Sequence, residues 1–472
     1  AKMDSFVENC LGHIVETCFK TRRFAVFSGL IMTQKTRAIF LMKNLMKPTF
    51  IYAGGSLMNQ AIPFILLPVL TRFFTPEDYG ILATFIAIFG VMQIFISMGT
   101  IDASIRAYFD IGKKGLDFSK YVFNGFLINF TVFITVLFLW HFGKSYFEKI
   151  IPIPFVYQLL IPLLSLCVIV YSVPCKLWVF KKEPLPYVIF NATNMLLEAG
   201  LAVFLIVFMH FNWQGRVLGI LVSKLVFALI GIYILLKHKS CQISFNTTYI
   251  KDILNYGLPV VVHSSGFVII SAIDRFFLNK FIGLSATGIY SVSYSVCSLI
   301  GFVTSAFNAA WVPIFYEKLG TLSASGKRKL VKSTYIYFIL VLFSVALFAT
   351  VVPSILNILV GKKFLGAGLF IFWLALGFGF HGMYTLIVSY IFYEKKTYVL
   401  SKIAIVTVLL SFASNYVLIK INGAIGVAQA TCLVFLVRFL LVWYFSNKVY
   451  PMPWLFFMRR APQAPGAVRV GA

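Results

Sequence analysis

Acidic residues are scarce in this sequence, with 15 Asp and Glu against 41 Lys and Arg. Charged residues of both signs make up only 12% of the chain, whereas soluble domains carry roughly 25%. Because 60% of the residues are hydrophobic, a water-soluble fold cannot bury the apolar surface, which excludes a soluble enzyme or a nucleic-acid-binding domain. The seven cysteines are scattered without CxxC spacing, and a GxxxxGK[ST] loop is missing, so we expect no metal and no cofactor.

What the sequence has instead is a series of long apolar runs. Each is about 20 residues long, enough for a helix to cross a hydrocarbon core roughly 30 Å thick. We predict an all-α, polytopic membrane protein whose connections are too short to fold as a catalytic domain. The twelve predicted spans are residues 50–71, 80–103, 121–140, 155–175, 187–208, 217–236, 256–273, 285–311, 333–352, 367–391, 399–419 and 424–445.

The basic residues predict how these spans are oriented. About 30 of the 41 Lys and Arg fall on one side when the spans alternate, and such an excess marks cytoplasmic segments. Both termini are therefore expected in the cytoplasm. We expect residues 1–46 to be a disordered or interfacial extension. The short apolar stretch 24–32 is interrupted by polar residues and followed by basic residues instead of the small-residue cleavage site of a signal peptide. Residues 455–472 are expected to be a disordered tail of low complexity.

The two halves of the chain repeat one another. The end of span 1, Arg72-Phe-Phe followed by Gly80-Ile, parallels the end of span 7, Arg275-Phe-Phe followed by Gly288-Ile. Because six spans return the chain to the side where it started, the second half enters the membrane in the same sense as the first. The repeat is therefore parallel.

A parallel repeat predicts two six-helix bundles, here residues 47–245 and 246–454. Two such bundles are related by an axis along the membrane normal and enclose a substrate path at their interface, as in an alternating-access transporter. Because one chain supplies both bundles, we expect a monomeric transport unit. An ancient duplication without transport is the open alternative.

Three segments carry a resemblance to a known family. They are GGSLMNQAIPFILLPVLTRFFTPEDYGILATF (residues 54–85), FNAAWVPIFYEK (residues 307–318) and NGAIGVAQATCLVFLVRFLLVWYFSNKVYPMPW (residues 422–454). The chain resembles bacterial polysaccharide flippases of the Wzx type in the order and spacing of these segments. These belong to the multidrug/oligosaccharidyl-lipid/polysaccharide (MOP) exporter superfamily, which also contains the MATE and MurJ-like exporters.

The resemblance implies a function that composition and periodicity do not show. Such a flippase moves an undecaprenyl-diphosphate-linked oligosaccharide, for example an O-antigen unit, from the cytoplasmic to the periplasmic leaflet of the bacterial inner membrane. It performs no covalent chemistry, so no enzyme activity is expected. Its partners are the lipid-linked oligosaccharide, membrane lipids and a coupling ion, H⁺ or Na⁺, if one is used.

Two arginines at equivalent positions of the repeat are candidate substrate ligands. Arg72 and Arg275 end spans 1 and 7, and Asp274 precedes Arg275 as a candidate for charge pairing or coupling. A guanidinium group offers bidentate donors to the phosphate oxygens of an anionic head group. The alternative is that both arginines anchor the helices at the headgroup interface.

Further charges lie inside the predicted spans, where they are costly and usually face a wet cavity or a partner. Asp102 and Arg106 are four residues apart on one helix face and could pair with each other, or Arg106 could receive the lipid diphosphate. Lys224 and Arg438 could line the cavity. Glu198 is the expected partner of one of them.

Polar uncharged groups complete the candidates. Asn59 and Gln60 in span 1 and Asn308 in span 8 could bind sugar hydroxyls, although such side chains also hold helices together. His263 and His381 could relay protons, because imidazole titrates near neutral pH, or could serve packing alone.

Two other functions stay open at this point. A cation-coupled multidrug exporter of the same superfamily would need buried acids, and the excess of basic groups within the spans argues against it. A membrane glycan polymerase or glycosyltransferase would be expected to have a large extramembrane loop or clustered acidic and His residues at one interface, and the sequence has neither.

Overall fold

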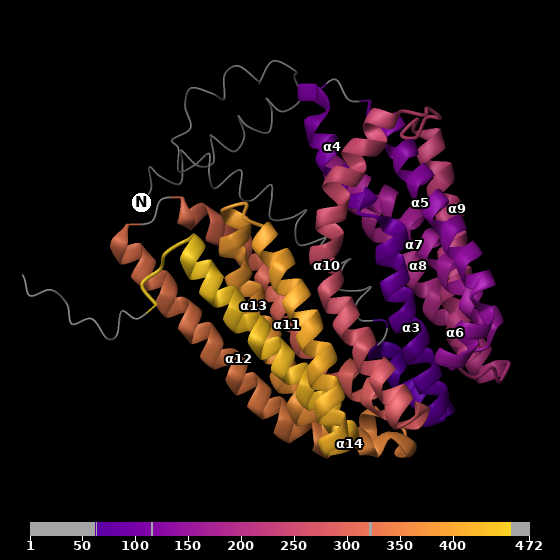
Figure 1. Cartoon of the computed structure of the whole chain (residues 1–472), viewed down its shortest axis with the longest axis vertical. Helices are drawn as coiled ribbons and strands as arrows, with labels where there is room; N and C mark the ends of the chain where they lie inside the picture. Colours follow the sequence, from indigo (N-terminus) through magenta and orange to yellow (C-terminus); the bar gives the residue numbers. More distant parts are fainter. Residues whose placement is uncertain (1–61, 63, 115–116, 321–322, 455–472) are drawn as a thin grey trace, which may run out of the picture.

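Helices form nearly all of the described part of the chain (Figure 1), which contains no strand. This computed structural model describes residues 62, 64–114, 117–320 and 323–454. A short apolar helix, Phe64–Phe73, comes first. The elements that follow are α3 (Pro76–Ser97), α4 (Thr100–Lys114), α5 (Phe118–Phe142), α6 (Lys144–Ile150), α7 (Phe155–Lys181), α8 (Pro184–Val203), the π-helix η1 (Phe204–Phe208), α9 (Trp213–Lys237), α10 (Thr247–Phe281), α11 (Leu284–Leu319), α12 (Ala324–Leu359), the 3₁₀ helix η2 (Lys362–Ala367), α13 (Gly368–Tyr393) and α14 (Tyr398–Val449).

The predicted all-helical membrane fold is confirmed. Among the described residues, nine helices are long and apolar enough to cross a membrane, and α10, bent by 46°, is a tenth. α14 has 52 residues, about 78 Å of helix, which is too long for one span. It breaks at Gly423, where φ is 57°, so its two halves are the predicted spans 11 and 12. Most of span 1, the predicted N-terminal extension and the predicted C-terminal tail lie outside the described residues.

One predicted span is wrong in its extent. Residues 80–103 were expected as a single helix, but α3 ends at Ser97 and α4 begins at Thr100. Met98 and Gly99 between them have φ of 46° and 70°, and a left-handed residue ends a helix. Asp102 and Arg106 therefore lie on α4, a separate helix, and not at the end of a span.

The helices form two groups. In Figure 1, α3 to α9 lie on one side, α11 to α14 lie on the other, and α10 runs between them. We call α3 to α9 the N-terminal bundle and α10 to α14 the C-terminal bundle. α10 packs against α14 of its own bundle and also against α3 and α4, so it contacts both bundles. The predicted division at residues 245 and 246 falls between α9 and α10.

The bundles meet where the first turns of α3 and α11 cross. A Cβ atom on Gly80 would overlap the carbonyl oxygen of Leu284, and a Cβ atom on Gly288 would overlap the carbonyl oxygen of Pro76. Only glycine lets the two backbones approach this closely. Gly80 and Gly288 are the two equivalent glycines of the sequence repeat, and the structure brings them together.

Side chains tie the bundles together around this crossing, which we call the glycine crossing. The amide of Asn279 on α10 donates to Thr84 Oγ1 on α3 over 2.8 Å. The backbone N–H of Gly361 donates to Thr71 Oγ1 over 3.1 Å. Ser285 Oγ donates to the Glu77 carboxylate over 3.3 Å, so α10, α11 and the segment before η2 all contact the N-terminal bundle here.

The opposite end of the molecule has a different contact between the bundles. Arg106 on α4 donates to the Asp252 carboxylate on α10, which also accepts a 2.8 Å hydrogen bond from the Tyr121 hydroxyl. The Arg106 guanidinium lies 4.4 Å from the ring centre of Tyr256, one turn further along α10. This ion pair fixes the first half of α10 to α4 and α5.

Hydrogen bonds also hold the segment before α10 against α5. Asn124 donates to the carbonyl oxygen of Ser244 over 2.7 Å and accepts from the N–H of Asn246 over 3.0 Å. Asp117 caps the start of α5, and the hydrogen bond from the Ser119 hydroxyl lowers the pKa of its carboxyl group. The connection between the bundles is therefore anchored to the N-terminal bundle.

The glycine crossing gives a first prediction. In a Glu77→Cys/Ser285→Cys background, a short thiol-specific cross-linker should join the cysteine pair, because the ends of the native side chains lie 3.3 Å apart. Adding Gly288→Ala should lower the cross-linked fraction by about tenfold, because the new methyl group overlaps a carbonyl oxygen and overpacking costs about 1 to 3 kcal/mol. Gly200→Ala on α8 is the matched control, since a Cβ atom there meets no atom within 4 Å. Equal cross-linking in both variants would contradict the crossing.

Candidate functional site

A central cavity lies between the two bundles, next to the glycine crossing. Its volume is about 630 Å³, and its walls come from both bundles. The N-terminal bundle contributes α3 and the start of α9, and the C-terminal bundle contributes the second half of α10, one face of α11 and α13; the short helix 64–73 lines it as well. Most of the lining is apolar, so the few charged and hydroxyl groups in the wall determine which ligands it can hold.

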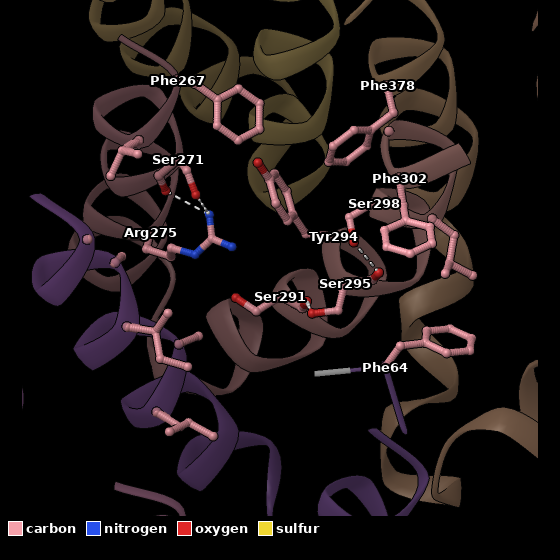
Figure 2. A pocket seen from close by; sticks show the side chains of 18 of the residues that line it. Phe64, Phe267, Ser271, Arg275, Ser291, Tyr294, Ser295, Ser298, Phe302 and Phe378 are labelled. Atoms are coloured by element: carbon pink, nitrogen blue, oxygen red, sulfur yellow. Dashed lines mark hydrogen bonds between the residues drawn. The ribbon is translucent and has the colours of Figure 1, made fainter. Parts of the chain in front are cut away.

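Arg275 on α10 is the cationic group of the C-terminal bundle in this wall. Arg275 is only 8% exposed. Its Nη1 donates to the carbonyl oxygen of Ser271 over 2.7 Å and to Ser271 Oγ over 2.6 Å. The guanidinium lies 4.6 Å from the ring centre of Tyr294, and Figure 2 shows both facing the same open space. The ion pairs formed among the described residues do not include Arg275. Its charge is thus available to an anion in the cavity.

Hydroxyl groups line the α11 side of the cavity. Ser291, Ser295, Ser298 and Ser305 lie on one face of the helix, at spacings of three, four and seven residues. Ser295 and Ser298 donate to carbonyl oxygens one turn back, and the Ser291 hydroxyl is buried without a partner among the described residues. This face offers hydrogen bonds to a polar ligand.

A charged cluster of the N-terminal bundle reaches the same cavity. Glu198 on α8 accepts from Arg216 Nη2 over 2.8 Å and pairs with Lys224 Nζ over 3.1 Å, both on α9. Arg216 lines the cavity. The sequence led us to expect Lys224 or Arg438 as the partner of Glu198, and of these two it is Lys224. Arg216 is not among the residues predicted for the site, because the predicted span begins at residue 217 whereas α9 begins at Trp213 and includes Arg216.

Asp274 is fully buried inside the C-terminal bundle and does not line the cavity. Its carboxylate accepts hydrogen bonds from Tyr290 over 2.9 Å, Thr431 over 2.8 Å and Asn415 over 3.1 Å. These donors come from α11 and from both halves of α14. Asp274 therefore joins three helical segments around one acceptor, next to Arg275.

The structure does not bring Arg72 to the cavity. Arg72 is exposed, whereas Thr71 beside it is buried and accepts the hydrogen bond from Gly361. Successive residues of a helix point about 100° apart, so when Thr71 faces the C-terminal bundle Arg72 faces away. The expected basic pair of Arg72 and Arg275 is not formed at this site.

Of the two alternatives for Arg106, the pair with Asp102 is not formed. Arg106 binds Asp252 instead, because α10 begins alongside α4 and the Tyr121 hydroxyl holds the Asp252 carboxylate in place. Asp252 lies 146 residues further along the chain than Arg106, so no local spacing signalled this partner.

The remaining candidates lie apart from the cavity or outside the described part. Arg438 is buried against Tyr384, 4.6 Å from its ring centre and 3.3 Å from its hydroxyl. Asn308 is half-buried and lies outside the lining. His381 lines the cavity, and its ring packs against those of Phe267 and Tyr384. Asn59 and Gln60 lie outside the described residues, as does the side chain of His263.

Comparison with known proteins assigns the chain to a family. The family model described as "Polysaccharide biosynthesis protein" matches residues 45–318. The match covers more than half of the chain's 472 residues. The chain belongs to the polysaccharide biosynthesis protein family. This family membership agrees with the resemblance to polysaccharide flippases of the MOP superfamily.

Two curated relatives of this polysaccharide biosynthesis protein come from Haemophilus influenzae. An "Uncharacterized membrane protein" is 24% identical over 361 residues, which cover 75% of this chain and 85% of the relative. The "Lsg locus putative protein 1" is 23% identical over 379 residues, which cover 78% of this chain and 90% of the relative. Both matches extend well into the C-terminal bundle, given their length.

Solved structures share the fold of this polysaccharide biosynthesis protein. An inward-facing multidrug resistance MATE family transporter of the MOP superfamily aligns with a TM-score of 0.62 at 15% identity, covering 84% of this chain and 94% of that one. An outward-facing multidrug resistance MATE family transporter aligns with a TM-score of 0.54 at 14% identity, covering 85% and 95%. The fold and the family together identify a multi-pass membrane transporter of the MOP superfamily.

The buried carboxylate of Asp274 gives a second prediction. Asp274→Ala removes the acceptor of three buried hydrogen bonds, and a hydrogen bond to a charged group contributes about 1.5 to 3 kcal/mol. We expect the free energy of unfolding in mixed micelles to fall by about 3 kcal/mol or more. Glu148→Ala, at an exposed acid on α6, is the control and should change it by less than about 0.5 kcal/mol. A stable Asp274→Ala variant would show that these hydrogen bonds do not hold α11 and α14 to α10.

Proposed function

We propose that this transporter flips an undecaprenyl-diphosphate-linked oligosaccharide from the cytoplasmic to the periplasmic leaflet of the bacterial inner membrane. The observation that carries the proposal is Arg275, a buried guanidinium in the cavity between the bundles whose ion-pairing capacity is unused by the described residues. Asp274 attracts Arg275 electrostatically but forms no ion pair with it, so the guanidinium can still bind an anionic ligand at this site. The diphosphate of the carrier lipid supplies such an anion, and Arg275 can bind two of its oxygens at once.

The rest of the wall suits the sugar part of this cargo. The serine face of α11 offers hydroxyl groups, and Tyr294 offers an aromatic ring, the two kinds of group that bind sugars through hydrogen bonds and stacking. A volume of about 630 Å³ is within the range of pockets that bury a drug-sized ligand. The cavity therefore accommodates the diphosphate and its first sugars, while the prenyl chain remains in the lipid.

The arrangement of the bundles supports alternating access. The glycine crossing joins them on one side of the cavity, and the first half of α10 joins them at the opposite end. The higher TM-score belongs to the inward-facing MATE transporter. We infer that the crossing is the periplasmic side and that this conformation loads cargo from the cytoplasm, where the excess of Lys and Arg places both termini.

A cation-coupled multidrug exporter is the alternative that the shared MATE fold leaves open. Such an exporter needs a buried acid that exchanges a cation for a proton or sodium ion. Glu198 is the acid that pairs with the wall residue Arg216, and two cationic side chains already occupy it. Efflux of a cationic dye that depends on sodium or protons and is lost in Glu198→Gln would favour this alternative over glycan flipping.

The third prediction tests the flippase directly in a glycan-producing host strain whose own flippase gene is deleted. The chain should restore surface glycan, Arg275→Gln should lower it by about tenfold or more, and Arg275→Lys should retain part of it, because a single ammonium group keeps the charge but loses bidentate binding. Complete lipid-linked repeat units should accumulate in the cytoplasmic leaflet of the Arg275→Gln strain. The measurements are surface glycan and the sidedness of the lipid-linked pool.

Lys280→Gln is the matched control for this experiment. Lys280 is exposed on the same helix, five residues beyond Arg275, and should be dispensable. Variant levels in the membrane are compared by immunoblotting. Normal surface glycan with Arg275→Gln, or an unchanged lipid-linked pool when the chain is absent, would refute the proposed cargo.

A further inference from the structure

Glu198, Arg216 and Lys224 form a buried cluster with one acid and two bases. Each carboxylate oxygen of Glu198 takes one cation: Oε1 takes Arg216 at 2.8 Å and Oε2 takes Lys224 at 3.1 Å. The exposed fractions of the three side chains are 7%, 7% and 15% in the order Glu198, Arg216 and Lys224. The cluster therefore carries one uncompensated positive charge in a place where charge is expensive.

The two bases differ in what surrounds them. Arg216 lines the central cavity, and its Nη1 is buried without an acceptor among the described residues. Lys224 is absent from the lining and lies 4.8 Å from the ring centre of Tyr171. They are eight residues apart on α9, about 12 Å along its axis, and reach Glu198 from opposite directions. Arg216 alone is placed to meet a ligand in the cavity.

We propose that Glu198 is a shared counter-ion that releases Arg216 to an anionic ligand while Lys224 keeps the carboxylate neutralised. In the empty cavity Arg216 is held at Glu198. When a phosphate or diphosphate group enters, Arg216 turns its unsatisfied guanidinium to the anion, and Lys224 remains as the partner of Glu198. The proposal deepens the proposed function, since the anion would be the diphosphate head of the cargo, and it assigns Arg216 and Lys224 separate roles.

The position of Arg216 connects its release from Glu198 to the contact between the two bundles. Arg216 belongs to the N-terminal bundle and Arg275 to the C-terminal bundle, and both line the same cavity. Tyr79 of α3 lies within electrostatic reach of both guanidinium groups. An anion held by the two arginines bridges the bundles, so its arrival and departure change the attraction between them.

A binding experiment separates this exchange from a purely structural cluster. The full chain in lipid nanodiscs is titrated with a short-chain prenyl diphosphate, with the matching uncharged prenol and inorganic phosphate as comparison probes. Arg216→Gln should weaken diphosphate binding by about tenfold, as expected for the loss of one charge-assisted hydrogen bond. Lys224→Met should weaken it by a similar factor, because Glu198 then has no other cation and retains Arg216.

The decisive variant is the double substitution Glu198→Gln/Lys224→Met. It removes the carboxylate that holds Arg216, so diphosphate binding should return to within about threefold of the wild type. Lys224→Met leaves a neutral buried pair of Glu198 and Arg216, and the double variant keeps the net charge of +1 that the wild-type cluster has. Thermal unfolding of each preparation checks that both variants fold. Lys237→Met, at an exposed lysine on the same helix, is the matched control and should bind as the wild type does.

Several outcomes overturn the proposal. They are wild-type affinity in Lys224→Met, no recovery in the double variant, or equal binding of the prenol and the prenyl diphosphate by the wild type. The result is independent of the cargo assignment. If the diphosphate probe binds with the expected pattern but the chain fails to restore surface glycan, the counter-ion exchange holds and the proposed glycan cargo is wrong.

Discussion

The close approach of α3 and α11 at Gly80 and Gly288 is the constraint on which the arrangement of the two bundles depends. Carbonyl oxygens occupy the positions where Cβ atoms would stand, so the helices cross with backbone against backbone. In a membrane, helix association relies on such packing more than on the hydrophobic effect, because lipid tails are as apolar as the helices. The crossing brings the hydrogen bonds of Asn279 and Thr71 into register and places the cavity next to it.

The charged side chains that line the cavity are basic. Arg275 forms no ion pair among the described residues, and the cluster around Glu198 has two bases for one acid, so each bundle contributes a basic group to the cavity wall. Asp274, although next to Arg275 in sequence, is occupied by hydroxyl and amide donors behind the wall. The interface between the bundles is therefore positive, in a region of low dielectric constant where a single charge acts strongly.

The sequence predicted the helical fold, the extents of most spans and the position of Arg275 near the path between the bundles, because hydropathy and the internal repeat are local signals. It misjudged residues that depend on long-range packing. Asp252 could not be matched to Arg106, because the two residues are 146 positions apart in the chain. Arg72 occupies the same position in the repeat as Arg275, but its side chain is exposed and faces away from the C-terminal bundle. The break at Met98 and Gly99 interrupts an otherwise apolar run. Arg216 was missed because a helix start misplaced by a few residues moved it from the wall into a loop.

The bend in α10 has a mechanical consequence. Its first segment, Thr247–Val262, is fixed to α4 and α5 by Asp252, while its second, Ser264–Phe281, packs with α14 and carries Arg275. One helix therefore connects both bundles through a hinge of 46°. The first segment is about 24 Å long, so each 10° change in the hinge shifts its far end by about 4 Å. A small rotation at the bend between the two segments would therefore move the first segment by several ångströms relative to Arg275 on the second.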